Sequence, residues 1–335
     1  MLNPIQEHRD ALWKQRYRIL VTYGLQIAAA DSTRGLALSN RSGVEQLYAW
    51  QIQTGELAQL TNRPEGTGNT GDSIPNAILS PDGNFVYYFN DVKGNEVGHF
   101  VRVPFTGGSP EDITPDLLQY TGFSLNMSST GNRCGFIQPR DGIYSICCLD
   151  VQPDGSLGQL KILYQSTNQT RGPILSYNGE VAVIETKDAG SADFDLVAFE
   201  VATGQHIASL TEEEGSLELY LASPLSGDMR FLALSSRTGS WRPLLWNPIT
   251  GERVDLVFDT IEGDLVPMDW SADAVISSRI LLRQDQQVVQ HLYIYDVENH
   301  IARRLEQSGR SFLGISDLSL IGWTTSTGMA RASDW

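Results

Sequence analysis

The sequence predicts an all-β fold, a seven-bladed β-propeller of four-stranded antiparallel blades whose last blade is incomplete. A turn signal recurs about every 48 residues and is clearest at Ser80-Pro81-Asp82-Gly83. The stretches between these turns hold short runs rich in β-branched and aromatic residues, which favour strands. Self-similarity at about 40 to 50 residues is itself typical of propeller blades.

Each interval is expected to contain four strands. The first precedes the turn, as at residues 25–29, 76–79 and 266–270. The second follows the turn, as at 85–89 and 181–184. The third carries an aromatic and aliphatic cluster, as at 47–50, 244–246 and 292–295. A Thr-Gly turn then leads to the fourth strand, and glycine suits this turn because tight hairpins need a positive φ.

The turn positions predict seven blades. They fall at residues 35, 83, 131, 179, 227, 274 and 322. After Gly322 the sequence given continues only to residue 335, so the seventh blade is expected to lack its outer strands. Either residues 17–23 close that blade, or the chain is part of a longer one, because an unpaired sheet edge promotes aggregation.

A short helix is expected before the first blade. Asn3 can cap it, Pro4 suits a first helical turn and Gln6 can reach back to the cap. The predicted organisation is a helical segment over residues 1–16 and a propeller over residues 17–335.

Composition restricts the class of partner. The 335 residues include 24 basic and 40 acidic side chains, a formal net charge of −16, which opposes binding to nucleic acids and to anionic membranes. There is no signal-peptide pattern at the start and no apolar run of about 18 residues. The few cysteines, expected to be buried strand thiols, fit a reducing compartment. A cytoplasmic location is therefore expected.

The sequence lacks the usual catalytic motifs. No G-x-S-x-G nucleophile elbow, P-loop or dinucleotide-binding motif is present, and the five histidines have no metal-ligand spacing. We therefore expect a chain without catalytic residues, metal or cofactor, and not an enzyme. An enzyme using carboxylates in the central funnel would need two converging acids, and the inner strands offer only Asp269 as a clear candidate.

Two groups of charged residues are candidate binding sites. Glu212, Glu213 and Glu214 follow the end of a blade and could form an acidic collar that captures a substrate amine, although such a run is more often a solvated loop. Arg41 and Arg237 occupy equivalent places between second and third strands. They could project from one face as docking groups, although stacked or solvated arginines are the commoner interpretation.

These repeats resemble the N-terminal propeller of prolyl oligopeptidase-family serine peptidases, in the bacterial acylaminoacyl-peptidase and dipeptidyl-aminopeptidase branch. The resemblance is carried by the Ser-Pro-Asp-Gly turn, the Leu-Tyr-Ala-Trp strand at 47–50 and the Leu-Thr blade ending at 60–61. It is also carried by the segments 39–43, 94–99 and 102–104, and it extends over residues 10–320.

The resemblance implies a seven-bladed disc that caps an α/β-hydrolase domain and admits only small or flexible peptides. In that family the catalytic Ser, Asp and His lie in the hydrolase domain, so no catalytic residue is carried over to this chain. The implied partners are peptide substrates or such a hydrolase domain, and a homo-oligomer is also compatible with it. The alternative is a stand-alone Tol–Pal-type propeller that binds a protein or peptide as a scaffold.

Overall fold

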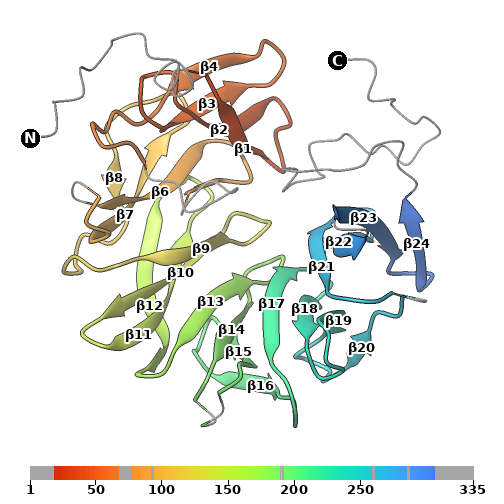
Figure 1. Ribbon diagram of the computed structural model, residues 1–335. Coiled ribbons are helices and arrows are strands. Elements are labelled where there is room, and N and C mark those ends of the chain that lie inside the picture. The colour runs from red at the N-terminus through yellow and green to blue at the C-terminus, as the bar shows by residue number, and fades with distance from the viewer. Residues whose placement is uncertain are drawn as a thin grey trace, which may run out of the picture.

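The computed structural model describes residues 19–67, 77–91, 94–188, 190, 192–258, 261–284 and 287–305. These residues form six sheets, each of four antiparallel strands in simple chain order, arranged around a ring (Figure 1). The first strands of successive sheets neighbour one another around the centre of the ring, and the fourth strands lie at the rim.

The first three blades occupy the N-terminal half. Blade 1 contains β1 (Thr22–Ile27), β2 (Arg34–Ser39), β3 (Gln46–Gln51) and β4 (Glu56–Gln59). Blade 2 contains β5 (Ala77–Leu79), β6 (Phe85–Asp91), β7 (Gly98–Pro104) and β8 (Glu111–Asp112). Blade 3 contains β9 (Phe123–Met127), β10 (Arg133–Arg140), β11 (Ile143–Val151) and β12 (Leu157–Ser166).

The remaining three blades repeat this plan. Blade 4 contains β13 (Thr170–Leu175), β14 (Val181–Thr186), β15 (Asp195–Glu200) and β16 (His206–Leu210). Blade 5 contains β17 (Leu217–Ala222), β18 (Phe231–Ser235), β19 (Arg242–Trp246) and β20 (Arg253–Asp255). Blade 6 contains β21 (Leu265–Trp270), β22 (Val275–Gln284), β23 (Gln287–Asp296) and β24 (Ile301–Leu305).

The all-β class and the four-stranded antiparallel blades are confirmed, but the count of seven blades is wrong. Six of the recurring turns join the first and second strands of the six blades. The seventh, at Gly322, was reached by extending the interval and lies outside the described residues. Residues 22 and 23 do not close another blade, because they belong to β1 and pair with β2 of blade 1.

The fold is also corrected at the N-terminus. The helix expected over residues 1–16 lies outside the described residues, and the part of the chain that the structure describes contains no helix. The described fold is therefore a six-bladed propeller made of strands and turns.

The recurring turn has a local physical cause. In blade 2 the Gly83 amide donates to the Ser80 carbonyl at 2.8 Å, with Gly83 at φ +70°, a conformation that favours glycine. The Ser80 hydroxyl accepts from the Phe85 amide at 2.9 Å, which fixes the start of β6. Blade 4 repeats this geometry, since the Ser176 hydroxyl accepts from the Val181 amide at 3.0 Å.

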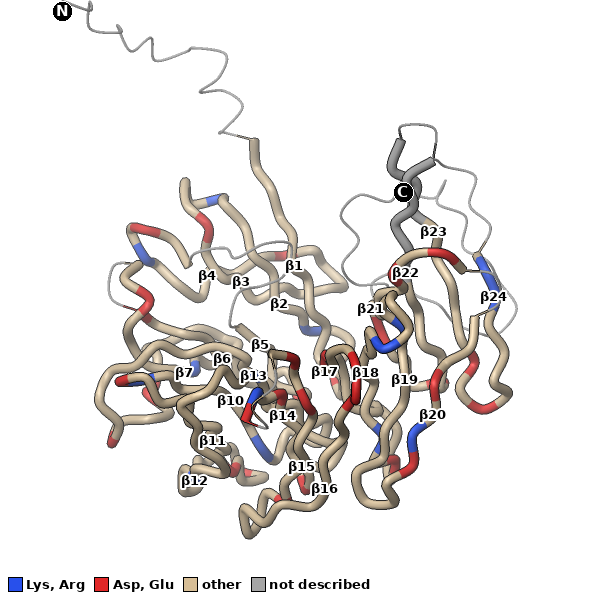
Figure 2. Tube along the Cα trace, turned by 60° about the horizontal axis from the view of Figure 1, so that its bottom comes forward, with Lys and Arg blue, Asp and Glu red and all other residues tan. Residues whose placement is uncertain are grey.

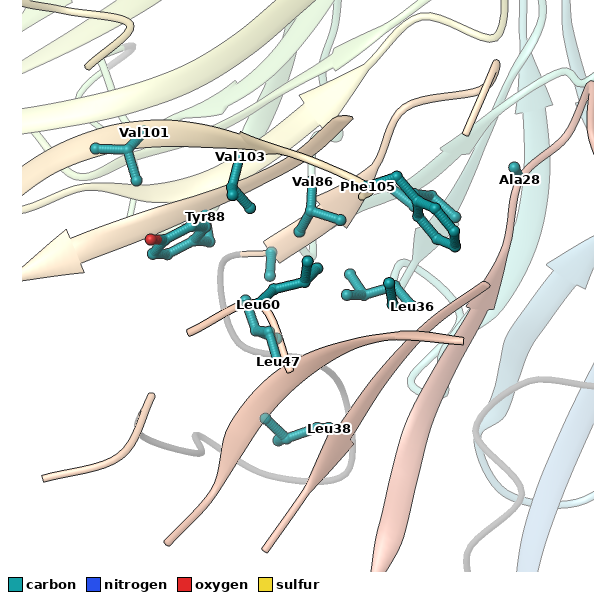
Figure 3. Close-up of a cluster of buried hydrophobic side chains, with 13 residues drawn as sticks. Ala28, Leu36, Leu38, Leu47, Leu60, Val86, Tyr88, Val101, Val103 and Phe105 are labelled. Atoms are coloured by element: carbon teal, nitrogen blue, oxygen red, sulfur yellow. The ribbon is translucent and has the colours of Figure 1, made fainter. Parts of the chain in front are cut away.

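The core lies between successive blades. Five clusters of buried apolar side chains each join neighbouring sheets, from blades 1 and 2 to blades 5 and 6. Figure 3 shows the first of them, where Leu36 of β2 faces Val86 and Phe105 of blade 2. Burying such side chains contributes about 1.5–3 kcal/mol each, so the blade interfaces hold the ring together.

Arginine side chains also form hydrogen bonds between some of the neighbouring blades. Arg34, at the start of β2, donates to the carbonyl of Gly83 in the next blade at 3.1 Å. Arg133, at the same place in blade 3, donates to the carbonyl of Gly179 at 2.6 Å. Each recurring turn in these pairs is therefore also a contact point for the preceding blade.

Candidate functional site

A pocket of about 330 Å³ opens where the first strands of blades 3, 4 and 5 meet. Inner-strand positions are where a propeller presents side chains to its central funnel. The volume of the pocket lies at the lower end of the range that is usual for small-ligand sites. Its lining combines one arginine, two glutamates and small or apolar residues: Ser124, Leu125, Asn126, Arg171, Gly172, Pro173, Ile174, Glu185, Glu218 and Leu219.

The strand pairing places the first two charges together. Arg171 of β13 lies directly opposite Glu185 of β14 in the antiparallel register. The register shifts immediately after this pair, between Arg171 and Ile174. Gly172 stands in the shift at φ +99°, and a Cβ there would lie 3.2 Å from the Val183 carbonyl oxygen, so the position is restricted to glycine.

Glu185 is the most buried charged group of the pocket, with 4% of its surface exposed. Its Oε1 accepts the Leu219 amide of blade 5 at 2.6 Å, and its Oε2 lies 3.4 Å from Nη1 of Arg171. Burial raises the pKa of Glu185 to about 7; the Leu219 amide and Arg171 oppose the rise, and the nearby Glu218 adds to it. The carboxyl group can therefore gain or lose its proton near neutral pH.

Arg171 is held by an aromatic ring as well as by Glu185. Its guanidinium carbon lies 4.5 Å from the ring centroid of Phe194, and the Lys187 ammonium lies 4.6 Å from the same centroid. Cation–π contacts of this kind favour a fixed orientation. The side chain of Arg171 nevertheless remains 48% exposed and available to a molecule in the pocket.

Glu218 supplies the second carboxylate from β17, and it is half-buried. Among the described residues its side chain makes no hydrogen bond or ion pair. An unpaired carboxylate beside a second one is electrostatically unfavourable unless a cation or proton is shared. The pocket therefore carries two formal negative charges against one positive charge.

The residues predicted from the sequence lie elsewhere. Arg41 is exposed in the turn between β2 and β3, and Arg237 is exposed in the turn between β18 and β19, where it pairs with Asp255. Glu213 and Glu214 are exposed. None of the five lines the pocket, and whether they bind a partner stays a prediction.

Glu212 occupies a different environment from its two neighbours. Its side chain is 6% exposed, accepts from the Ser235 hydroxyl and lies 2.8 Å from Nη2 of Arg253. Arg253 also contacts Asp255 at 2.9 Å, and Asp255 pairs with Arg237. The structure thus joins two of the predicted residues, Glu212 and Arg237, in one ion-pair network, which Arg41 of blade 1 does not enter.

Sequence reasoning missed Arg171, Glu185 and Glu218. It named Asp269 as the clear acid of the inner strands, whereas Glu218 also lies on an inner strand and Glu185 lies on the second strand of blade 4. Glu218 is therefore a second acid on an inner strand, beside Asp269, that the sequence reasoning did not count. A usable signal was Glu185 itself, a single carboxylate that directly follows the apolar run 181–184.

Other features of the described residues suggest no metal or membrane site. Within these residues no group of three or more His, Cys, Asp or Glu side chains could hold a metal ion. The three cysteines are buried and unbridged, as expected for strand thiols, and burial raises the pKa of both Cys147 and Cys148 to about 12. No described helix is long and apolar enough to cross a membrane.

Solved structures of known proteins share this fold. An oligogalacturonate lyase from Vibrio parahaemolyticus is 14% identical with a TM-score of 0.61, over 84% of this chain and 77% of that protein. Prolyl oligopeptidase B from Galerina marginata is 12% identical with a TM-score of 0.60, over 85% of this chain and 43% of that protein. A puromycin hydrolase is 15% identical with a TM-score of 0.56, over 86% of this chain and 46% of that protein.

These neighbours establish the β-propeller fold and nothing finer, because all are below 25% identity. This chain spans less than half of each of the two hydrolases. No protein-family model and no curated protein sequence matches it.

Proposed function

We propose that this chain is a non-catalytic propeller that binds peptides at its centre and controls their access to an α/β-hydrolase domain. The carrying observation is the pocket lined chiefly by the inner strands of three successive blades, the strands that neighbour one another around the centre of the ring. A packed ring excludes folded proteins by size, and the pocket adds a contact that flexible peptides can reach.

The charge of the pocket supports a peptide rather than a polyanion. Oligogalacturonate, named for the lyase that shares the fold, carries many carboxylates, as nucleic acids carry phosphates. Two glutamates against one arginine, in a chain of net charge −16, disfavour both kinds of ligand. Peptides can instead offer neutral amides and positive groups.

One observation favours a second function. Glu185 and Glu218 both line the pocket, and a carboxyl group such as Glu185, whose pKa burial raises to about 7, can carry out acid–base chemistry. A carboxylate-dependent enzyme acting in the funnel is therefore the rival of the binding function. The stand-alone scaffold differs only in lacking a hydrolase partner and would use the same pocket.

A binding and turnover experiment tests the proposal. The purified chain is incubated with a defined mixture of short peptides, and binding is followed by calorimetry while the peptides are analysed by mass spectrometry. We expect binding without cleavage, no labelling by a fluorophosphonate probe, and weaker binding after filling the pocket with Ser124→Tyr. Arg41→Ala, outside the pocket, serves as the matched control.

Absence of peptide binding, or binding unaffected by Ser124→Tyr in a variant that keeps its circular dichroism spectrum, would contradict the proposal. Cleavage that disappears in Glu185→Gln and Glu218→Gln would favour the carboxylate enzyme. Adding a separately produced hydrolase domain then separates the two binding functions, since an access domain should alter peptide turnover by that partner and a scaffold should not.

A further inference from the structure

We infer that the pocket recognises the main chain of an extended peptide, through backbone groups of the β-bulges in its inner strands, and not a particular side chain. This inference rests on the proposed peptide-binding function and names the part of the peptide that the pocket contacts. The class of ligand is therefore a neutral, extended polypeptide segment of variable sequence.

Bulges in two inner strands supply much of the pocket lining. In β9, Ser124 and Leu125 together lie opposite a single residue of β10, and in β13, Gly172 and Pro173 lie opposite a single residue of β14. All four of these bulged residues line the pocket. A bulge interrupts the regular pairing of strands, so its extra residue has no strand partner of its own.

Both bulges hold the main chain in an unusual conformation. Ser124 has φ +57° and Gly172 has φ +99°. Glycine adopts such angles freely, whereas for serine this conformation is unfavourable and persists only where the surrounding structure imposes it. A bulge also changes the direction of the peptide groups beside it, and here those groups border the pocket.

The inner strands also have one edge that no other strand of their sheet pairs. β9, β13 and β17 each stand at the end of a four-stranded sheet, and such an edge presents amides and carbonyls to an extended peptide. Two amides of this edge are bound by side chains of the preceding blade. Asn126 of β9 accepts from the Leu175 amide at 2.9 Å, and Glu185 of the second strand β14 accepts from the Leu219 amide at 2.6 Å. Main-chain amides of the inner edge are therefore within reach of a hydrogen-bonding group that lies beside them.

Three polar side chains of the lining already stabilise the fold. Asn126 and Glu185 hold amides of the next blade, and Arg171 contacts Glu185 at 3.4 Å and the ring of Phe194 at 4.5 Å. Selection of a ligand then falls mainly on the bulged main chain. Hydrogen bonds between main chains give affinity without depending on the sequence of the peptide.

Peptides with altered main chains provide the first test. N-acetyl-tetra-alanine amide is compared with four analogues in which one alanine at a time is replaced by lactic acid, which turns one amide into an ester and removes one donor. By calorimetry, at least one ester should bind about 3- to 10-fold more weakly than the parent, the loss expected for one hydrogen bond. Replacing single alanines by valine or glutamine keeps the main chain and should change the affinity by less than about threefold.

A matched pair of glycine variants locates the effect. Gly172 and Gly43 have nearly equal φ angles, +99° and +98°, so alanine imposes similar backbone strain at both positions. At Gly172 the added Cβ would also lie 3.2 Å from the Val183 carbonyl oxygen and disturb the bulge, whereas at Gly43, between β2 and β3, it would meet no atom within 4 Å. Gly172→Ala should weaken binding of the tetra-alanine peptide by about 10-fold or more, and Gly43→Ala should leave it unchanged. Circular dichroism verifies that both variants fold, and if Gly172→Ala does not, the ester series decides alone.

The outcomes separate the two proposals. If every ester binds as tightly as the parent, or if folded Gly172→Ala keeps the parent affinity, main-chain recognition is wrong and peptide binding stands. If peptides of the defined mixture bind but the tetra-alanine peptide does not, recognition depends on side chains, and the inference is wrong in the same way. If no peptide of either set binds, the proposed function is wrong as well.

Discussion

Two charged clusters in blades 4 and 5 differ in their balance of charge. At the rim, Glu212, Arg253, Asp255 and Arg237 contribute two negative and two positive charges, and each has an opposite partner. At the centre, Arg171 is the one basic residue that lines the pocket with Glu185 and Glu218, and it pairs with Glu185. Figure 2 shows that acidic and basic positions are spread around the ring. The two clusters therefore differ from each other in how their charges are paired, and not in lying within an otherwise uncharged molecule.

This difference separates a structural cluster from a candidate binding site. A balanced network on the rim needs no further molecule, and it ties β20 to the segment between β16 and β17. An unbalanced group in a pocket is stabilised by a proton or by a ligand. Carboxyl groups that line a pocket and have a shifted pKa are therefore better indicators of function than runs of acidic residues.

The largest effect is expected in the balanced network. Arg253→Ala leaves the nearly buried Glu212 carboxylate without its cation, which should destabilise the chain by about 3 kcal/mol. Urea unfolding at pH 7 measures the change, with Arg41→Ala as a control that should stay within about 0.5 kcal/mol. A loss below about 1 kcal/mol would show that the rim network adds little to stability.

The next effect concerns the pH dependence of stability. Burial raises the pKa of Glu185 to about 7 in the folded chain against the ordinary glutamate pKa of 4.5, so between these pH values the folded state holds a proton that the unfolded state has lost. Stability is therefore lost as pH rises through this window, by about 3 kcal/mol at most. Glu185→Gln should lack this contribution and give a flatter profile in urea unfolding from pH 4.5 to 8. An unchanged profile would contradict the raised pKa.

Glu218→Gln should have a smaller effect on folding. Since Glu218 has no partner among the described residues, its replacement should change the free energy of unfolding by less than about 0.5 kcal/mol. Because Glu218 raises the pKa of Glu185, the variant should lower that pKa, which carboxyl ¹³C NMR can follow. A large destabilisation would mean that Glu218 stabilises the fold. It would then not be the unpaired carboxylate that distinguishes the central pocket from the rim network.

The sequence predicted the strands better than it predicted the number of blades or the residues of the pocket. The spacing of the turns identified the blades because each Ser-x-x-Gly turn fixes its own geometry through local hydrogen bonds. The count of seven blades failed because the 48-residue interval was extended to Gly322 without a strand pattern to support a further blade there. The pocket was missed because Arg171, Glu185 and Glu218 come from three strands and two blades, a proximity that no local pattern encodes.

The last effect is expected at the exposed end of the rim network. Arg237 and Asp255 are 44% and 41% exposed, and surface ion pairs contribute about 0–1 kcal/mol, so Arg237→Ala should lose much less stability than Arg253→Ala. Urea unfolding of the two variants side by side measures the contrast. Peptide binding should be unchanged in Arg237→Ala, because this residue lies outside the pocket. Equal losses in both variants would mean that the network stabilises the blade as a unit, and weakened peptide binding would extend the functional surface to the rim.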